Sequence, residues 1–427
     1  MSVLSKSGAL ALNTVTGHQT VEVGFQPKLV VFQSTPDTAN IVTSIANGHF
    51  TMGAFDGTTQ AVQASNTRNG TSTSDTQKYA DIANVIYVAD PPGTMTPDFI
   101  ASAYSLNPTG FTIDITNAPP IDYRFGYWAL GGDDITNVKV GSFISKGSTG
   151  SQAITGLGFQ PDIIICWTSG SWGGLPADQG DAVVGIGFAN GIATDNQYAM
   201  GSWSQSGITD VLATQSTNNR GYVIWCPLQK TFVSLQATLT SFDVSGFTLN
   251  WVAHSPVSQH NISYIAIKGT ANLYSRVGRI LISGVTGNTA SVTGFGFTPG
   301  CGLFASASFP TVTGTMAAGE RSSMGWVDFE KNMFQTARAS RFNAGYLSAW
   351  HTSHDLRTYR YINYSTSQLI DEATLQTWDT DGFTFLSNKG NGAGGNLVGY
   401  LVMNADSITP APPTPQPELE ENTGIYV

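Results

Sequence analysis

Charged side chains are scarce in this chain. Asp, Glu, Lys and Arg together make up 11% of its 427 residues, against roughly 25% in ordinary soluble domains. Ser, Thr, Asn and Gln must therefore supply the surface polarity, a composition typical of extracellular or virion β-proteins. The net charge of −10 argues against nucleic-acid binding, because neutralising phosphates takes clustered Lys and Arg.

Long hydrophobic runs are missing as well. The longest apolar stretches have the length of a strand, far below the roughly 20 residues that cross a bilayer, so we expect no membrane insertion. Residues 1–6 lack the apolar core of a secretory signal peptide. We therefore expect a protein that is made in a cytoplasm and stays there until something releases it.

Cysteine is rare and odd in number. Cys166, Cys226 and Cys301 cannot all form disulfides with one another, and the first two lie in apolar, strand-like stretches. This placement favours free thiols that are buried in the core.

The chain contains one turn motif in three copies. Gly-Phe-x-Pro occurs at Gly24–Pro27, Gly158–Pro161 and Gly296–Pro299, and an apolar stretch follows each copy. Proline suits the first residue of a strand because it lacks an N–H, and glycine supplies the unusual backbone angle before it. Each copy therefore predicts a turn that leads into a buried strand.

Other landmarks recur with nearly the same spacing. Opening strands lie at Gly8, Gly141 and Gly278, Gly-Phe-Thr begins at Gly110, Gly246 and Gly382, and a final aromatic-led strand begins at Tyr127, Tyr264 and Tyr400. Landmarks that keep one order at one period indicate internal triplication. We expect tandem domains at residues 1–137, 138–274 and 275–406, each large enough to bury its own core, and a C-terminal arm at residues 407–427.

Hydrophobic periodicity indicates the fold class. Apolar and polar residues alternate with period two, most clearly at Val233–Thr240 and Phe247–Trp251, whereas no stretch keeps a helical period over three turns. We predict an all-β protein of three antiparallel β-sandwiches of jelly-roll type, with about eight strands in each. The polar stretch from Asp56 to Asp81 is predicted to be a long loop, either mobile or used for contacts.

The end of the chain has a different composition. Residues 409–417 are rich in proline, which favours an extended polyproline-type segment, and residues 418–427 add three glutamates and an apolar tip. Such a tail is either a disordered remainder or an arm that docks on a partner. In the second case Pro412, Pro415, Pro417 and Tyr426 are the candidate docking residues.

Basic residues gather in the third repeat. They are Arg321, Lys331, Arg338, Arg341, Arg357, Arg360 and Lys389. An ordinary solvated surface is the interpretation that we favour, and a docking face for an acidic neighbour is the alternative.

No catalytic constellation is evident, and we expect no catalytic residue, cofactor or metal. No Gly-x-Ser-x-Gly elbow or phosphate-binding glycine loop occurs, although carboxylates from distant strands could still pair for sugar hydrolysis. His351, His354 and Asp355 form the densest titratable cluster, but their spacing matches no metal framework. Asp178–Asp181 and Asp379–Gly382 could hold Ca²⁺, yet Asp-Gly pairs are first of all turn formers.

Two tryptophans are candidates for contact with a sugar. Trp172 and Trp203 lie in Gly/Ser-rich stretches of the second repeat, where an exposed indole could stack on a sugar ring. Packing of each ring on its neighbours is the alternative that we favour.

The repeated motifs resemble a known class of modules. Gly-Phe-Gln-Pro with its apolar strand, Gly-Phe-Thr, and the final strands at Tyr127–Gly132 and Tyr264–Gly269 are similar to modules of tailed-bacteriophage virion proteins of the minor tail or head-decoration type. The resemblance covers about 400 residues, and the third copy departs from it at Gly300 and Met403. It implies a location in the virion, a non-enzymatic role in assembly or at the surface, and no catalytic residues.

Two hypotheses follow. In the first, the protein is a structural accessory of a phage particle that contacts capsid or tail subunits, or further copies of itself. In the second, it is an adhesin that binds a host-surface glycan or receptor through its polar loops and Trp172 or Trp203. A depolymerase of surface polysaccharide is the least favoured alternative.

Overall fold

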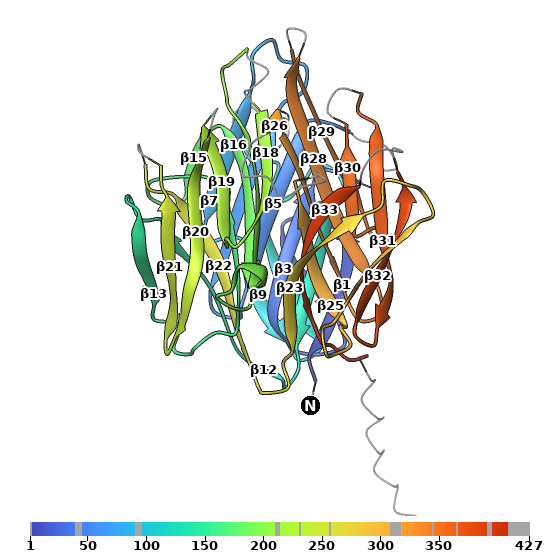
Figure 1. Ribbon diagram of the computed structural model, residues 1–427. Coiled ribbons are helices and arrows are strands. Elements are labelled where there is room, and N and C mark those ends of the chain that lie inside the picture. The colour runs from blue at the N-terminus through green and yellow to red at the C-terminus, as the bar shows by residue number, and fades with distance from the viewer. Residues whose placement is uncertain are drawn as a thin grey trace, which may run out of the picture.

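The computed structural model describes residues 2–38, 45–89, 96–209, 214–229, 232–255, 258–307, 317–318, 320–343, 346–363, 366–390 and 395–408. In these ranges the chain is almost entirely antiparallel β-structure (Figure 1), with one short 3-10 turn, η1 (Thr194–Asn196), and no α-helix. The all-β fold class is therefore confirmed. The strands fall into three sets with one common order, which we call units 1, 2 and 3.

Each unit contributes eleven strands. Unit 1 contains β1 (Leu4–Ala11), β2 (Gly17–Glu22), β3 (Pro27–Thr35), β4 (Ile45–Ala46), β5 (Gly48–Phe55), β6 (Gln60–Thr67), β7 (Thr76–Asp81), β8 (Ile86–Val88), β9 (Phe99–Asn107), β10 (Gly110–Asn117) and β11 (Arg124–Gly131). Unit 2 contains β12 (Ile135–Ile144), β13 (Gly150–Thr155), β14 (Ile163–Thr168), β15 (Ala177–Gly180), β16 (Ala182–Ala189), β17 (Gln197–Ser204), β18 (Thr214–Arg220), β19 (Ile224–Gln229), β20 (Phe232–Asp243), β21 (Gly246–Ala253) and β22 (Asn261–Gly269). Unit 3 contains β23 (Ser275–Ile282), β24 (Thr289–Thr293), β25 (Cys301–Ser306), β26 (Ala317–Ala318), β27 (Glu320–Val327), β28 (Met333–Asn343), β29 (Tyr346–His354), β30 (Tyr359–Ile362), β31 (Leu369–Asp379), β32 (Gly382–Lys389) and β33 (Asn396–Met403).

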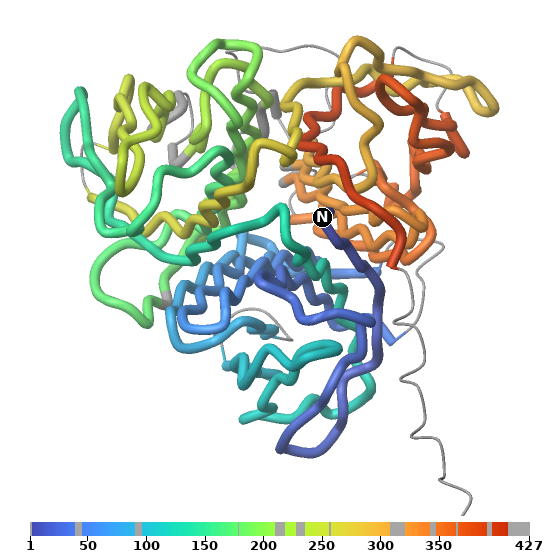
Figure 2. The backbone as a smooth tube through the Cα atoms, turned by 90° about the horizontal axis from the view of Figure 1, so that it is seen from below, coloured from blue at the N-terminus to red at the C-terminus, as the bar shows by residue number. Residues whose placement is uncertain are grey.

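Every unit is built from two sheets. In unit 1 the seven-stranded inner sheet has the order β1-β11-β3-β5-β6-β7-β15, and the four-stranded outer sheet has the order β2-β10-β9-β8. The chain crosses between the sheets from β1 to β2, from β2 to β3, from β7 to β8 and from β10 to β11, as in a jelly roll. Units 2 and 3 repeat this order, and the three units lie around a common centre (Figure 2).

The seventh strand of each inner sheet comes from a neighbouring unit. β15 of unit 2 pairs with β7 of unit 1, β26 of unit 3 with β18 of unit 2, and β4 of unit 1 with β29 of unit 3. An unpaired edge strand exposes backbone donors and acceptors to other chains. The exchange covers one such edge in every unit and links the units in a closed ring.

Inner-sheet strands are buried on both faces. In β3, Leu29 and Val31 enter a core that all three units share, whereas Val30 and Phe32 enter the core between the two sheets of unit 1. β14 and β25 follow the same alternation. This double burial explains why the stretch after each Gly-Phe-x-Pro turn is apolar without interruption.

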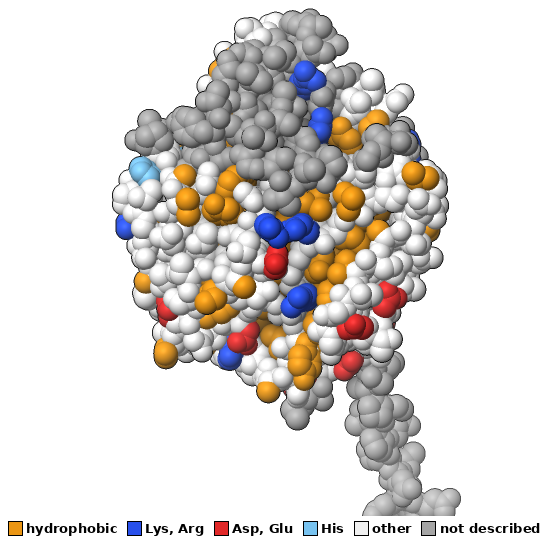
Figure 3. Space-filling model, viewed as in Figure 1, with side chains coloured by type: hydrophobic (Ala, Val, Ile, Leu, Met, Phe, Trp, Pro, Cys, Tyr) orange, Lys and Arg blue, Asp and Glu red, His pale blue; other side chains and the backbone are white. Residues whose placement is uncertain are grey.

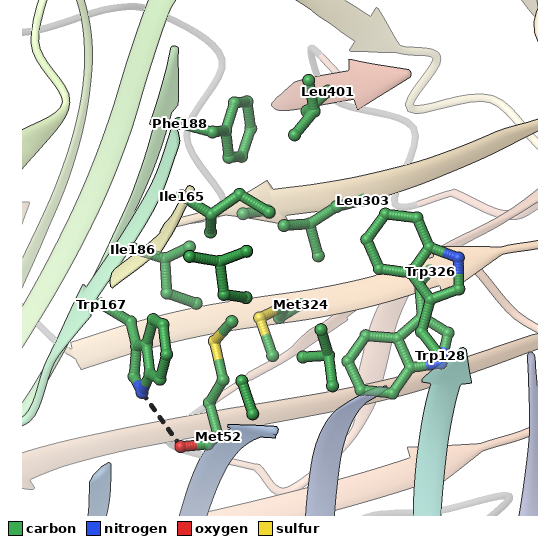
Figure 4. Close-up of a cluster of buried hydrophobic side chains, with 14 of the residues drawn as sticks. Met52, Trp128, Ile165, Trp167, Ile186, Phe188, Leu303, Met324, Trp326 and Leu401 are labelled. Carbon is green, nitrogen blue, oxygen red and sulfur yellow. Dashed lines mark hydrogen bonds between the residues drawn. The ribbon is translucent and has the colours of Figure 1, made fainter. Parts of the chain in front are cut away.

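The shared core is formed by large side chains from every unit. Trp128 comes from β11, Trp167 from β14 and Trp326 from β27, and Figure 4 shows them around Met52 and Met324. The Trp167 indole Nε1–H donates to the backbone oxygen of Met52 at 3.0 Å. Each unit therefore has a core between its own two sheets and, in addition, buries its inner face against its neighbours.

The local predictions for turns and cysteines are confirmed. Gly24, Gly158 and Gly296 have φ angles of 87°, 81° and 76°, which only glycine adopts without strain. Cys166, Cys226 and Cys301 are buried free thiols. The first strand of unit 2, β12, begins at Ile135.

The interpretation of residues 56–81 as a polar loop is wrong. This stretch contains β6 and β7, whose side chains are almost all buried. Gln63 shows the reason, since its amide accepts a hydrogen bond from the Ser169 hydroxyl at 2.6 Å and donates to the Ser263 hydroxyl at 3.0 Å, both in unit 2. Polar strands can be buried when a neighbour supplies partners, and the estimate of eight strands was low partly because this hairpin was missed.

Close packing between units gives a first prediction. A Cβ at Gly399 of β33 would lie 2.1 Å from ring carbon Cε1 of Tyr198 in unit 2, and the Tyr198 ring is buried and stacked on Phe188. Gly399→Ala should therefore lower the free energy of unfolding by about 1–3 kcal/mol, measured by urea denaturation. Gly174→Ala is the control, because no atom lies within 4 Å of a Cβ built there. Equal denaturation midpoints for the two variants would contradict this packing.

Candidate functional site

Three seams join the units, and we name them by the units they join: seam 1–2, seam 2–3 and seam 3–1. At two of them an aspartate accepts a backbone N–H from the first strand of the next unit. Asp56 accepts from Val140 at 2.8 Å, and Asp328 accepts from Ser7 at 2.9 Å. At seam 2–3 the corresponding residue is Asn190, whose amide donates to the backbone oxygen of Ser275 at 2.8 Å.

Seam 3–1 contains a buried ion pair. The His351 imidazole of β29 donates from Nε2 to Asp37 Oδ1 at 2.9 Å and from Nδ1 to the backbone oxygen of Asn47 at 2.6 Å. Both ring nitrogens face acceptors, so the geometry requires the doubly protonated, positively charged ring. Asp37 also accepts hydrogen bonds from the hydroxyls of Thr35 and Ser353. Burial alone would raise the pKa of Asp37, but His351 and these hydroxyls together hold it below its ordinary value.

Two arginines of the third repeat are buried, so the interpretation of its basic residues as an ordinary solvated surface is wrong for them. Arg338 donates to the Ser65 hydroxyl at 2.6 Å and to the Thr67 hydroxyl at 2.8 Å across seam 3–1. Within unit 3, Arg360 donates to the Glu372 carboxylate at 2.7 Å and to the Thr352 hydroxyl at 2.6 Å. The two guanidinium groups therefore stabilise contacts inside the protein.

A lysine takes the place of His351 at seam 1–2. Lys78 of β7 lies opposite Gln179 of exchanged β15, just as His351 lies opposite Ile45 of exchanged β4. The Lys78 ammonium is buried, and it lies 4.2 Å from the centroid of the Trp172 ring. Burial lowers the pKa of Lys78 to about 8, although the charge of Asp181 opposes this shift.

The two candidate sugar-stacking tryptophans have different surroundings. Trp203 lies in β17 with only 1% of its surface exposed, so its indole offers no face to a sugar. Trp172 is 38% exposed, but Lys78 covers one face and the His260 ring meets it edge-on. The structure therefore does not bring the two together as one platform. The candidate docking residues Pro412, Pro415, Pro417 and Tyr426 lie outside the described residues.

Surface grooves lie at the seams, each lined by residues of two units. The groove at seam 2–3 has a volume of about 760 Å³, and that at seam 1–2 about 640 Å³. Tyr274 lines the larger groove, where it is 51% exposed and stacked on Phe297 with ring centroids 5.9 Å apart. Leu4 and Ile408 line the smaller groove at seam 3–1, where the last described residues run beside β1. Sequence patterns did not identify the stacked pair of Tyr274 and Phe297 as a surface, because each groove forms only between units.

Of the two acidic stretches weighed as calcium sites, Asp379–Gly382 is a turn between β31 and β32, whereas Asp178–Gly180 belongs to strand β15 and Asp181 follows it. The Asp381 carboxylate accepts the backbone N–H groups of Gly294 and Gly296, and Asp379 accepts from the hydroxyls of Thr377 and Thr384. Asp181 accepts the backbone N–H of Ser206 at 2.8 Å. Across the described ranges, no group of three or more His, Cys, Asp or Glu side chains could hold a metal ion.

The chain matches no protein-family model, and no curated protein is significantly similar to it. Within the described residues, no helix has the length and hydrophobicity needed to cross a bilayer.

The buried ion pair at seam 3–1 gives a second prediction. Asp37→Asn removes the carboxylate and leaves the His351 cation buried without its partner, which should cost about 3–5 kcal/mol in free energy of unfolding. The matched control is Glu330→Gln, which breaks the exposed pair between Glu330 and Lys6 at the same seam and should cost no more than about 1 kcal/mol. Urea denaturation of both variants at pH 7 measures the difference, and similar losses would contradict the assignment.

Two buried histidines give a third prediction. Burial is the main cause that lowers the pKa of His260 to about 4 and the pKa of His354 to about 4. The unfolded chain takes up these protons near pH 6.5, so the free energy of unfolding should fall as the pH drops from about 6.5 to 4. Urea midpoints between pH 7 and 4.5 test this, and His260→Asn should reduce the slope. A wild-type midpoint that does not change over this range would contradict it.

Proposed function

We propose that the chain is a structural accessory protein of a bacteriophage particle, and that it occupies a three-fold or quasi-three-fold site as one polypeptide. The supporting observation is the closed ring of three equivalent units, with an exchanged strand at every seam and one shared core. Such a ring presents three similar surfaces around its centre (Figure 2), which matches a partner with three-fold symmetry.

Fusion of the three units in one chain has a physical advantage at such a site. A homotrimer must form from separate subunits, and its stability depends on their concentration. Here the units are covalently linked, so each finds its neighbours at a high effective concentration. Capsid and tail subunits are the partners we propose, in the role of a capsid decoration or a minor tail component.

Glycan binding is the second candidate function. The groove at seam 2–3 favours it, because Tyr274 and Phe297 present an aromatic surface beside the polar side chains of Asp162 and Lys268. Aromatic rings beside a few polar groups are the usual composition of a ligand groove. This groove replaces the Trp172 and Trp203 pair as the best-placed surface for a sugar.

The copy number in purified particles tests the first proposal. Quantitative mass spectrometry should find the protein at a fixed ratio to the major capsid protein after particles are washed and banded. Roughly hundreds of copies per particle would identify a capsid decoration. About three to a few dozen copies would identify a tail or vertex component, because the symmetry of a site sets how many copies it holds. Absence from washed particles, together with binding to host polysaccharide that Tyr274→Ala abolishes, would overturn it in favour of the glycan-binding candidate.

A further inference from the structure

One position on the first strand of every unit carries a basic residue. Gly8, Gly141 and Gly278 lie opposite Tyr127, Tyr264 and Tyr400 in the same register. Two residues before these glycines stand Lys6 in β1, Lys139 in β12 and Arg276 in β23. The three cations therefore occupy equivalent places, each at the seam with the preceding unit.

The seams differ in what faces this cation. Lys6 pairs with Glu330 at 2.6 Å, and Lys139 lies 4.0 Å from Asp56. At seam 2–3 the position of Asp56 and Asp328 belongs to the neutral Asn190. Within the described part of the chain, no hydrogen bond or ion pair joins the Arg276 guanidinium to another residue.

The buried tyrosine at each seam experiences the same difference. Burial raises the pKa of Tyr127 and of Tyr264 to about 12, and the charges of Asp328 and Asp56 respectively contribute to the rise. Burial also raises the pKa of Tyr400 to about 12, but the charges that act on Tyr400 are those of Arg276 and Arg279, and they oppose the rise. The charged groups that act on the tyrosine are therefore arginines at seam 2–3, whereas at the other two seams they include an aspartate.

Arg276 lines a pocket of about 290 Å³ with Arg220 and Arg279. Tyr198, Gln197 and Tyr400 form buried parts of its wall. Asp195 is the one carboxylate in the lining, at 3.1 Å from Arg220 and 4.0 Å from Arg279, and its side chain is 74% exposed. Basic side chains with an acidic one gather near the middle of the face in Figure 3, beside a band of hydrophobic side chains.

We propose that this pocket binds an oxyanion: a phosphate, sulfate or carboxylate group, either free or carried on a sugar. Three guanidiniums against one carboxylate leave two formal positive charges in a chain whose net charge is −10. Guanidinium groups match such anions because their N–H groups form a planar fork. Arg276 follows Ser275, which lines the aromatic groove of the same seam. The proposal does not depend on the function proposed above.

Calorimetric titration of the full chain at low ionic strength tests the site, with inorganic phosphate, sulfate, glucose 6-phosphate, glucuronate and glucose as probes. Phosphate should bind, and Arg276→Gln should weaken its binding about tenfold or more, because an arginine contact to an anion is charge-assisted. Raising the salt concentration should also weaken it, since the pocket is open to solvent. Tighter binding of glucose 6-phosphate than of phosphate would identify a sugar-borne anion, and equal binding a free one.

Two matched variants separate this site from general surface charge. Lys139→Gln removes the equivalent cation at seam 1–2, which Asp56 already faces, and should leave phosphate binding within about twofold. Asn190→Asp restores the carboxylate that the other seams have and should suppress phosphate binding. No phosphate binding by the wild-type chain at millimolar concentration, or equal losses in Arg276→Gln and Lys139→Gln, would overturn the proposal.

Discussion

The shared core of the three inner sheets is the constraint on which the rest of the structure depends. Leu29, Ile163 and Leu303 lie in inner-sheet strands that are buried on both faces, so one unit alone would expose a whole sheet face to water. Burial of apolar surface stabilises the folded state by roughly 25 cal/mol per Å². Because the three inner sheets face one another, every unit buries its inner face and is stabilised in this way. The exchanged strands β4, β15 and β26 follow from the same arrangement, because they lie where the sheets meet.

The sequence predicted the parts of this fold that are written locally. The triple Gly-Phe-x-Pro turn gave the positive φ angles and the strands that follow, and period-two alternation gave the half-buried outer strands. The uninterrupted apolar run at Ile163–Trp167 was the available signal for burial on both faces, and it was interpreted only as a buried strand. Strands β6 and β7 were not predicted, because residues such as Gln63 and Lys78 are polar and their partners lie in another unit.

The candidate sites could not be predicted for a related reason. Asp37 and His351 are 314 residues apart, and no sequence motif links the two residues. Trp203 looked like a loop residue because glycines and serines surround it, whereas those small residues serve close packing between strands. The basic position at Lys6, Lys139 and Arg276 is visible once the repeats are aligned, but only the structure shows which of them has a carboxylate opposite.

Covalent linkage lets the three seams diverge while the common scaffold stays the same. Seam 3–1 has a buried ion pair, seam 1–2 a lysine beneath a tryptophan, and seam 2–3 a neutral asparagine with an arginine pocket. The central claim is that these seams and the shared core make the three units one cooperative body. Differential scanning calorimetry of the whole chain tests it most directly: we predict one transition whose calorimetric enthalpy equals its van't Hoff enthalpy. Separate transitions for the units would contradict the account.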